Sequence, residues 1–241
     1  MSFIIAFFTG CFGSAISVIC GFGLGVFSMM FLPHFMSSTM AASAVVSITA
    51  VFQSAWIAFH YRKKVKIKDT LFMVIGYLVL STICVIFGKN IPNKTLKLAL
   101  GIFLIVLSIY FIFFSKKIKM QPTPRNGLIA GSLGGIMSSM FGVGGPPAGL
   151  YFSSCYDEKE EYLATIQTYF LVTNIYVTTI RAFNGIVTAE VLLASSVSLV
   201  GMVFGTYMGK KLFDKMNADA VRKAIYILMA VSGVILIAGS L

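Results

Sequence analysis

The chain contains few charged residues, and acidic residues are the scarcest of these. Only 8 of its 241 residues are Asp or Glu, and charged residues make up 11% of the sequence. A soluble domain has about a quarter of its residues charged. Because hydrophobic residues make up 58% of the chain, the composition excludes an ordinary soluble protein. It predicts an all-α polytopic membrane protein, located in the cell membrane with several passes.

Acidic residues are absent from the middle of every apolar run. They lie in loops or at the expected ends of helices, at Asp69, Asp157, Glu158, Glu160, Glu161, Glu190, Asp214 and Asp219. A cation transporter of the usual kind keeps a carboxylate inside the membrane. The distribution therefore favours an anionic solute over a cationic one.

The sequence also lacks the residue groups that support catalysis, metal binding or nucleotide binding. It has no His-Cys or Ser-His-Asp grouping and no nucleotide loop of the GxxxxGK type. Cys11, Cys20, Cys84 and Cys155 are scattered without a C-x-x-C pair, so we interpret them as small buried hydrophobes. We expect no enzyme activity, no catalytic residue, no bound metal and no cofactor.

Basic residues outnumber acidic ones, and 19 Lys and Arg residues give a net charge of +11. They cluster in short loops between apolar segments, as in the cytoplasmic loops of membrane proteins. We therefore expect the partners to be a small anionic substrate and the lipid bilayer, and not nucleic acid. The sequence leaves open whether the protein forms a homo-oligomer. Met1 to Thr9 carries no Lys or Arg, so we interpret it as part of the first membrane segment and not as a signal peptide.

The two halves of the chain resemble each other. Phe22–Gly25 matches Phe141–Gly144 at an offset of 119 residues, and at an offset of 121 Gln53 falls on Asn174, His60 on Arg181 and Gly88 on Gly209. We expect two homologous repeats, residues 1–120 and 121–241, that form one integrated membrane domain and are joined by the proline-containing linker Ser115–Arg125. The apolar runs that divide each repeat into a glycine-broken segment and three transmembrane helices are approximately 3–20, 24–33, 37–59, 70–87, 95–114, 127–141, 146–156, 162–180, 186–208 and 224–239.

The charge distribution bears on whether each glycine-broken segment crosses the membrane or re-enters on one side. If both cross, the two faces carry 10 and 9 Lys and Arg residues; if both re-enter, the counts are 15 and 4. The positive-inside rule expects the second kind of asymmetry. We therefore predict inverted repeats with re-entrant segments, cytoplasmic basic loops and both termini outside. The expected arm Asn126–Met140 has 15 residues and would be about 22 Å long, too short to span a core of about 30 Å.

The second glycine-rich break, Gly142–Pro147, is the first candidate for a solute site. Three glycines and two prolines cannot continue a helix, and broken backbone at membrane depth persists only inside protein or beside a wet cavity. A short helix beginning near Pro146 would leave free N–H groups from Gly142 to Gly145 at a positive helix end, which is an anion site. The alternative is helix–helix packing, which we prefer for Gly131, Gly134 and Gly135.

Polar residues follow each break within the expected helices. Gln53 and His60 are seven residues apart, as are Asn174 and Arg181, so each pair shares a helix face. Amides there would hydrogen-bond an anion, or alternatively a neighbouring helix. Arg181 would either attract the anion or extend to the membrane interface, while His60 fits the basic cytoplasmic boundary.

We therefore expect the two breaks to meet near the membrane midplane and form one site. The candidate substrate-binding residues are Gly21, Gly23, Gly25, Gln53, Gly142, Gly144, Gly145, Pro146, Gln167, Asn174 and Arg181.

The whole chain resembles the sulfite exporter TauE/SafE family. The resemblance rests on Gly21–Gly25 with Pro33 downstream and on Phe141–Pro146, although the first break has Leu24 and Val26 where the family is richer in glycine. It implies a permease that exports or takes up a small sulfur-containing anion, such as sulfite or an organosulfonate. We expect transport by alternating access, with one half moving against the other. A passive anion channel and a non-transporting membrane assembly factor are the alternatives.

Overall fold

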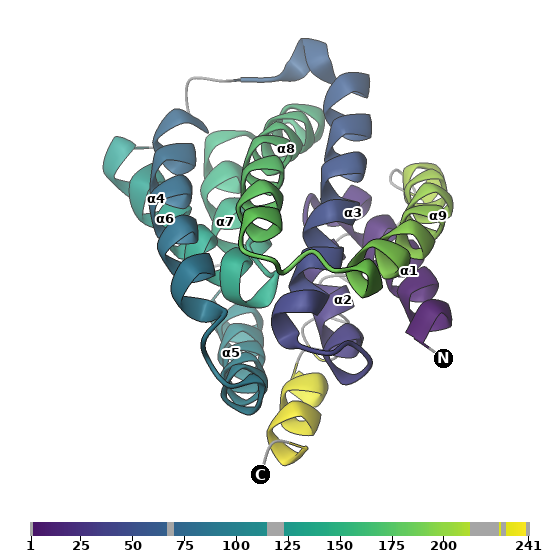
Figure 1. The fold of residues 1–241 in the computed structure, drawn as a ribbon. Coiled ribbons are helices and arrows are strands. Elements are labelled where there is room, and N and C mark those ends of the chain that lie inside the picture. Colours follow the sequence, from purple (N-terminus) through teal and green to yellow (C-terminus); the bar gives the residue numbers. More distant parts are fainter. Residues whose placement is uncertain (1, 67–69, 115–122, 213–226, 228–229, 240–241) are drawn as a thin grey trace.

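The computed structural model describes residues 2–66, 70–114, 123–212, 227 and 230–239, and these are almost entirely helical (Figure 1). Residues 230–238 are also helical. The elements are α1 (Ser2–Cys20), α2 (Leu24–Phe31), η1 (Leu32–His34), α3 (Thr39–His60), η2 (Arg62–Lys64), α4 (Leu71–Gly88), α5 (Asn93–Phe114), α6 (Pro124–Phe141), α7 (Gly145–Cys155), α8 (Lys159–Phe183) and α9 (Ala189–Leu212).

Within these described ranges, five helices are long and apolar enough to cross a membrane: α1, α3, α4, α5 and α9. Large apolar side chains remain exposed on their outer faces, for example Val79 and Phe87 of α4 and Val203 of α9. Such a surface suits lipid and not water. For the described residues, the prediction of an all-α chain with several helices able to cross a membrane is therefore confirmed. The linker residues 115–122, and residues 213–226 with the start of the last predicted run, lie outside the described residues.

Each half begins with two helices that fold back on each other at a glycine break. We call these breaks tip 1 (Gly21–Gly25) and tip 2 (Gly142–Pro147). The Ser28 hydroxyl in α2 donates to the Thr9 carbonyl in α1 at 3.5 Å, so α2 runs back along α1. In the second half, α7 returns along α6 and brings Tyr151 beside Gly127. Gly23 and Gly142 have φ angles of 148° and 66°, which favour glycine at both reversals.

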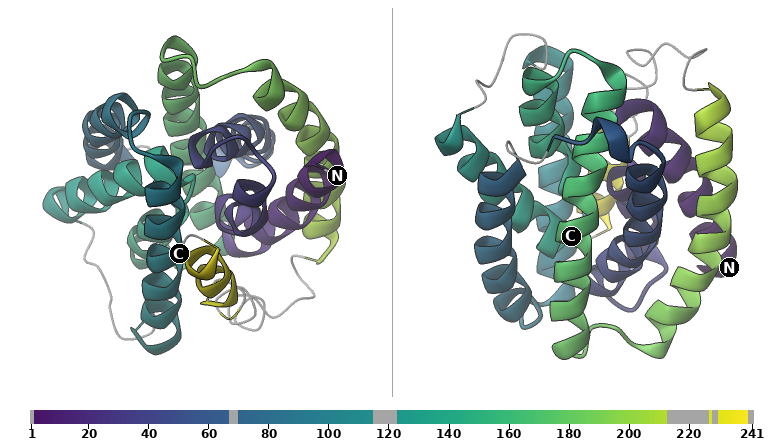
Figure 2. Two further views of the ribbon diagram at one scale, coloured as in Figure 1. Left: turned by 60° about the horizontal axis from the view of Figure 1, so that its bottom comes forward. Right: turned by 90° about the horizontal axis from the view of Figure 1, so that it is seen from above.

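The two halves interleave. Figure 1 shows α1 beside α9 at one flank and α4 beside α6 at the other, with α3 and α8 between them. Small residues bring these backbones together, since Gly201 and Gly205 of α9 lie against α1. Gly131 and Gly135 of α6 lie against α4, and Gly134 lies against Tyr169 and tip 2, which confirms the packing role predicted for these three glycines. The views in Figure 2 place residues 230–238 beside α5, where Gly233 contacts Gly101.

The second arm is longer than the sequence suggested. Helix α6 runs from Pro124 to Phe141 and has 18 residues, because Thr123 accepts a hydrogen bond from the Asn126 N–H and starts the helix early. It is about 27 Å long, close to the 19-residue α1. The expected length of 15 residues is therefore wrong, while α6 is not among the five helices that are long and apolar enough to cross a membrane.

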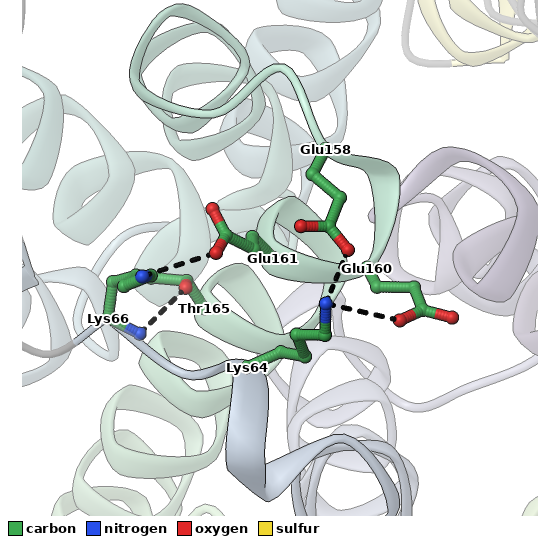
Figure 3. Close-up of polar contacts among 6 residues, drawn as sticks. All are labelled: Lys64, Lys66, Glu158, Glu160, Glu161 and Thr165. Carbon is green, nitrogen blue, oxygen red and sulfur yellow. Dashed lines mark hydrogen bonds and ion pairs between the residues drawn. The ribbon is translucent and has the colours of Figure 1, made fainter.

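The connections gather at two ends of the bundle. At one, the basic end, Lys64 Nζ lies 2.6 Å from Glu158 Oε1 and Lys66 Nζ lies 3.2 Å from Glu161 (Figure 3). The Glu158 hydrogen bond raises the pKa of Lys64 above its usual value. At the other, the opposite end, Lys89 Nζ donates to Asn184 at 3.0 Å.

Candidate functional site

Tip 1 and tip 2 lie directly against each other. Gly25 contacts the carbonyl of Gly142, and a Cβ at Gly145 would come within 2.8 Å of the Cβ of Phe22. A side chain at Gly25 or Gly145 would push the tips apart, so glycine is needed for this approach. The sequence comparison paired these two breaks, and the fold brings them together.

A small cavity lies where the tips meet α3 and α8. Its volume is about 50 Å³, enough for a few water molecules or one small anion, since a single water needs roughly 10–15 Å³. Eight of the predicted site residues line it: Gly23, Gly25, Gln53, Gly142, Gly144, Gly145, Gln167 and Asn174. Gly21, Pro146 and Arg181 are not among the lining residues.

Two short helices begin at this cavity. Helix α2 starts at Leu24 and α7 at Gly145, and neither has a side-chain cap. Among the described residues, the N–H groups of Gly23, Leu24, Gly25, Gly144 and Gly145 find no hydrogen-bond acceptor. Pro146 and Pro147 fill the first turn of α7, as predicted, and have no N–H to satisfy.

This arrangement suits an anion. Uncapped N–H groups at the start of a helix need an acceptor, and the macrodipole places partial positive charge at the same point. The cavity receives two such ends, and no carboxylate lines it in the part of the chain that the structure describes. The arrangement can therefore hold a small oxyanion mainly through backbone donors.

Tip 2 offers fewer donors than the sequence suggested. The Gly142 N–H donates to the Ser138 carbonyl at 2.9 Å, and the Val143 N–H donates to the Met137 carbonyl at 3.3 Å. The left-handed Gly142 allows this closing of α6, as in a Schellman motif. The expectation that these two N–H groups are free is wrong, and only those of Gly144 and Gly145 remain.

Both glutamines line the cavity, but their N–H groups are already used. Gln53 Nε2 donates to the Ser14 carbonyl at 2.9 Å and to Thr206 Oγ1 at 3.4 Å. Gln53 therefore hydrogen-bonds neighbouring helices, which was the alternative to binding an anion.

Gln167 fastens tip 1 to α8. Its Nε2 donates to the Gly21 carbonyl at 3.0 Å and to Ser17 Oγ at 3.4 Å. Its Oε1 accepts from Ser54 Oγ at 2.9 Å, so every hydrogen-bonding atom of the side chain is engaged.

Asn174 keeps a donor for the cavity. Its Nδ2 donates to the Phe170 carbonyl at 2.8 Å, and an amide nitrogen carries two hydrogens. The second hydrogen has no acceptor among the described residues.

Arg181 lies behind the cavity wall, fully buried. Its Nη1 donates to the Ser43 carbonyl at 2.9 Å, and its Nη2 donates to the Ser138 and Ser139 carbonyls at 2.8 Å each. Extension to the membrane interface is therefore wrong for this side chain. His60, the residue at the matching position in the first half, is exposed and lies 2.9 Å from Lys210 Nζ.

Several polar cavity residues were not among the predicted site residues, including Ser17 of α1 and Tyr77 of α4. The Tyr77 hydroxyl donates to Ser138 Oγ at 2.8 Å. A phenol in the middle of the apolar run 70–87 was the available signal, because a buried Tyr hydroxyl usually needs a polar partner.

The chain matches known membrane transporters along nearly its whole length. A family model described as sulfite exporter TauE/SafE matches residues 6–236. One relative, a probable sulfite/organosulfonate exporter TauE from Cupriavidus necator, is 22% identical over 222 residues, covering 89% of this chain and 85% of the relative. No solved structure matches.

Proposed function

The chain belongs to the sulfite exporter TauE/SafE family, and we propose that it is a multi-pass permease for a small sulfur oxyanion, either sulfite or an organosulfonate. The observation that carries the proposal is the convergence of two uncapped helix starts, those of α2 and α7, on one cavity. Oxyanions accept hydrogen bonds at every oxygen, and both tips present donors.

In this proposal the anion sits between tip 1 and tip 2. The N–H groups of Gly23, Leu24 and Gly25 bind it from one side, and those of Gly144 and Gly145 bind it from the other. Asn174 supplies a side-chain donor. Gln53 and Gln167 shape the wall and hold α1 in place, because their own donors are engaged.

The positions of the connecting loops support inverted repeats with re-entrant tips. If both broken segments crossed the membrane, the loops 62–68 and 157–161 would face opposite sides. The ion pairs Lys64–Glu158 and Lys66–Glu161 join these two loops (Figure 3). We propose that this basic end is cytoplasmic and that both termini are outside.

A cysteine introduced at Ser37 tests this topology in a variant whose four native cysteines are replaced. We expect a membrane-impermeant maleimide to label it from outside in intact cells. Labelling only after the membrane is opened would overturn the proposed sidedness.

We propose transport by alternating access, in which one repeat moves against the other around the tips. Each folded-back helix pair packs on a helix of the other half, α1 on α9 and α6 on α4. A movement between the halves would therefore move the two tips relative to each other and open the cavity to one side at a time.

A passive anion channel is the second candidate. It is favoured by the lack of a carboxylate at the cavity in the described part of the chain, since such a group commonly couples solute movement to protons. Flux into proteoliposomes separates the two: a permease coupled to an ion accumulates sulfite when a proton or sodium gradient is imposed, and a channel only equilibrates it.

Binding of a panel of anions to the purified full-length protein tests the function itself. We expect sulfite and organosulfonates to bind saturably, and matched neutral sulfones not to bind. An assembly factor that does not transport would bind none of them and would show no saturable flux.

A further inference from the structure

Arg181 is a buried cation without an acidic partner among the described residues. Its side chain is fully buried, and Nε has no hydrogen-bond partner. The described carboxylates lie at the ends of the bundle: Glu158, Glu160 and Glu161 pair with lysines, Asp157 lies beside them, and Glu190 accepts from the Ser37 N–H. The hydrogen bonds of the guanidinium go to the carbonyl oxygens of Ser43, Ser138 and Ser139.

Fastening a tip does not require such a charge. At tip 1, neutral side chains of the same helix do it: Tyr162 Oη donates to the Cys20 carbonyl at 3.1 Å, and Gln167 donates to the Gly21 carbonyl. Removing a charge from water is costly unless it is compensated. The cation at tip 2 therefore needs a reason beyond hydrogen bonding to α6.

The position of Arg181 supplies that reason. Ser138, whose carbonyl it holds, lines the cavity. Ser43, whose carbonyl it also holds, packs against Gly142 of the cavity wall, where a Cβ would lie 3.3 Å from the Ser43 Cα. The charge is thus one residue behind the wall, where neither water nor salt screens it well.

We propose that Arg181 is a positioning residue whose field makes this cavity prefer divalent oxyanions to monovalent ones without contact with the anion. The inference rests on the proposed function and narrows its substrate class to dianions, such as fully deprotonated sulfite. A fixed charge acts on an anion in proportion to the charge of that anion. A residue that only holds tip 2 in place would affect both kinds of anion alike.

The test compares sulfate with methanesulfonate, two tetrahedral anions of fixed charge at neutral pH, by calorimetric titration of the purified full-length protein. For Arg181→Gln we expect methanesulfonate to bind about tenfold more weakly and sulfate about a hundredfold more weakly, because the free-energy loss doubles with the charge. Arg181→Lys keeps the charge and should keep the ratio of the two affinities. Lys89→Gln, which removes an exposed cation, is the matched control and should leave the ratio unchanged.

A second pair of variants keeps the proposal testable if Arg181→Gln does not yield a monodisperse protein. Thr178 lies one turn before Arg181, the spacing at which an acid and an arginine pair on a helix. The affinities of Thr178→Asp are compared with those of the uncharged Thr178→Asn. The fold-loss in sulfate affinity should be about the square of the fold-loss in methanesulfonate affinity.

Equal losses for the two anions in Arg181→Gln, or in the Thr178 pair, would overturn the inference and leave the proposed function standing. Wild-type protein that binds neither anion nor sulfite would overturn the proposed function and the inference with it.

Discussion

Tip 1 and tip 2 are fastened to the same helix by different chemistry. Helix α8 holds tip 1 through the neutral side chains of Tyr162 and Gln167. It holds tip 2 through Arg181, which donates to the Ser138 and Ser139 carbonyls in the last turn of α6. The two helix pairs are otherwise alike, with glycine at the reversal and an uncapped short helix after it.

The difference between the tips distinguishes two properties of the proposed anion site: the placement of hydrogen-bond donors and the presence of a positive charge. Both tips supply hydrogen-bonding geometry, because each one presents backbone N–H groups to the cavity, three at tip 1 and two at tip 2. Among the described residues, charge is supplied at tip 2 alone, because Arg181 is the cation placed near the wall. Related halves can therefore share a backbone arrangement while one half carries the electrostatic part of recognition.

The largest effect is expected from driving the tips apart. At Gly25, any Cβ would overlap the carbonyl of Gly142, and backbone cannot rotate away as a flexible side chain can. We expect Gly25→Val to weaken sulfite binding at least about a hundredfold, about 3 kcal/mol, as for an overpacked core. Sulfite titration and proteoliposome flux measure it.

Gly88→Ala is the matched control for Gly25→Val. A Cβ at Gly88 would meet only the end of Met40, at 3.6 Å, so we expect normal expression and flux. Sulfite flux at the wild-type rate in Gly25→Val would show that the contact between the tips does not form the site.

A smaller loss of sulfite flux is expected at tip 2, where a Cβ added at Gly144 would come closest to a side chain. A Cβ at Gly144 would lie 2.7 Å from the Cβ of Ser138 and 3.1 Å from the Gly134 carbonyl oxygen. We expect Gly144→Ala to reduce sulfite flux about tenfold, equivalent to about 1.4 kcal/mol, while membrane insertion stays intact.

Ser138→Gly removes the closer of these two obstacles. The double variant should therefore recover part of the flux lost in Gly144→Ala, measured in the same proteoliposomes. Additive losses in the double variant would contradict steric conflict with Ser138 as the cause.

The hydrogen bonds of Gln167 at tip 1 and of Arg181 at tip 2 should also contribute different amounts to the stability of the protein. Gln167→Ala leaves the Gly21 carbonyl and the Ser54 hydroxyl without their partner, and we expect a cost of about 1–3 kcal/mol. Arg181→Ala removes three hydrogen bonds to carbonyls and should cost more, about 2–4 kcal/mol, since hydrogen bonds from a charged group are stronger.

Thermal unfolding of both variants in one detergent and at one scan rate compares these costs, because membrane proteins often unfold irreversibly. If Arg181→Ala unfolds at the wild-type temperature or above, the free-energy cost of burying the cation equals or exceeds the stabilisation from its hydrogen bonds. Arg181 would then not fasten tip 2.

Local chemistry made the architecture predictable. The chain reversals occur where Gly21, Gly23 and Gly142 interrupt apolar runs, because glycine and proline act on the backbone where they stand. The expected apolar runs match the observed helices to within a few residues at most ends. The offset of about 120 residues predicted which two breaks belong together.

Partners from distant parts of the chain were not predictable. Seven-residue spacing places Gln53 and Asn174 each on a face of its own helix, but it does not say which backbone lies opposite. Arg181 is two residues from the end of α8, a position typical of an interfacial cation. Its actual acceptors come from Ser43 of α3 and from the end of α6, which only the tertiary fold brings to it.

The smallest effect on stability is expected from removing the uncharged hydrogen bond between Tyr162 and tip 1. Tyr162→Phe removes the hydrogen bond from Oη to the Cys20 carbonyl and keeps the ring that packs against Gly21. We expect a loss of about 1 kcal/mol in stability and no change in the ratio of sulfate to methanesulfonate affinity, because no charge is altered. Thermal unfolding and the same two titrations measure both quantities. A changed ratio would mean that tip 1 also determines the charge preference, and the division of roles between the tips would then be wrong.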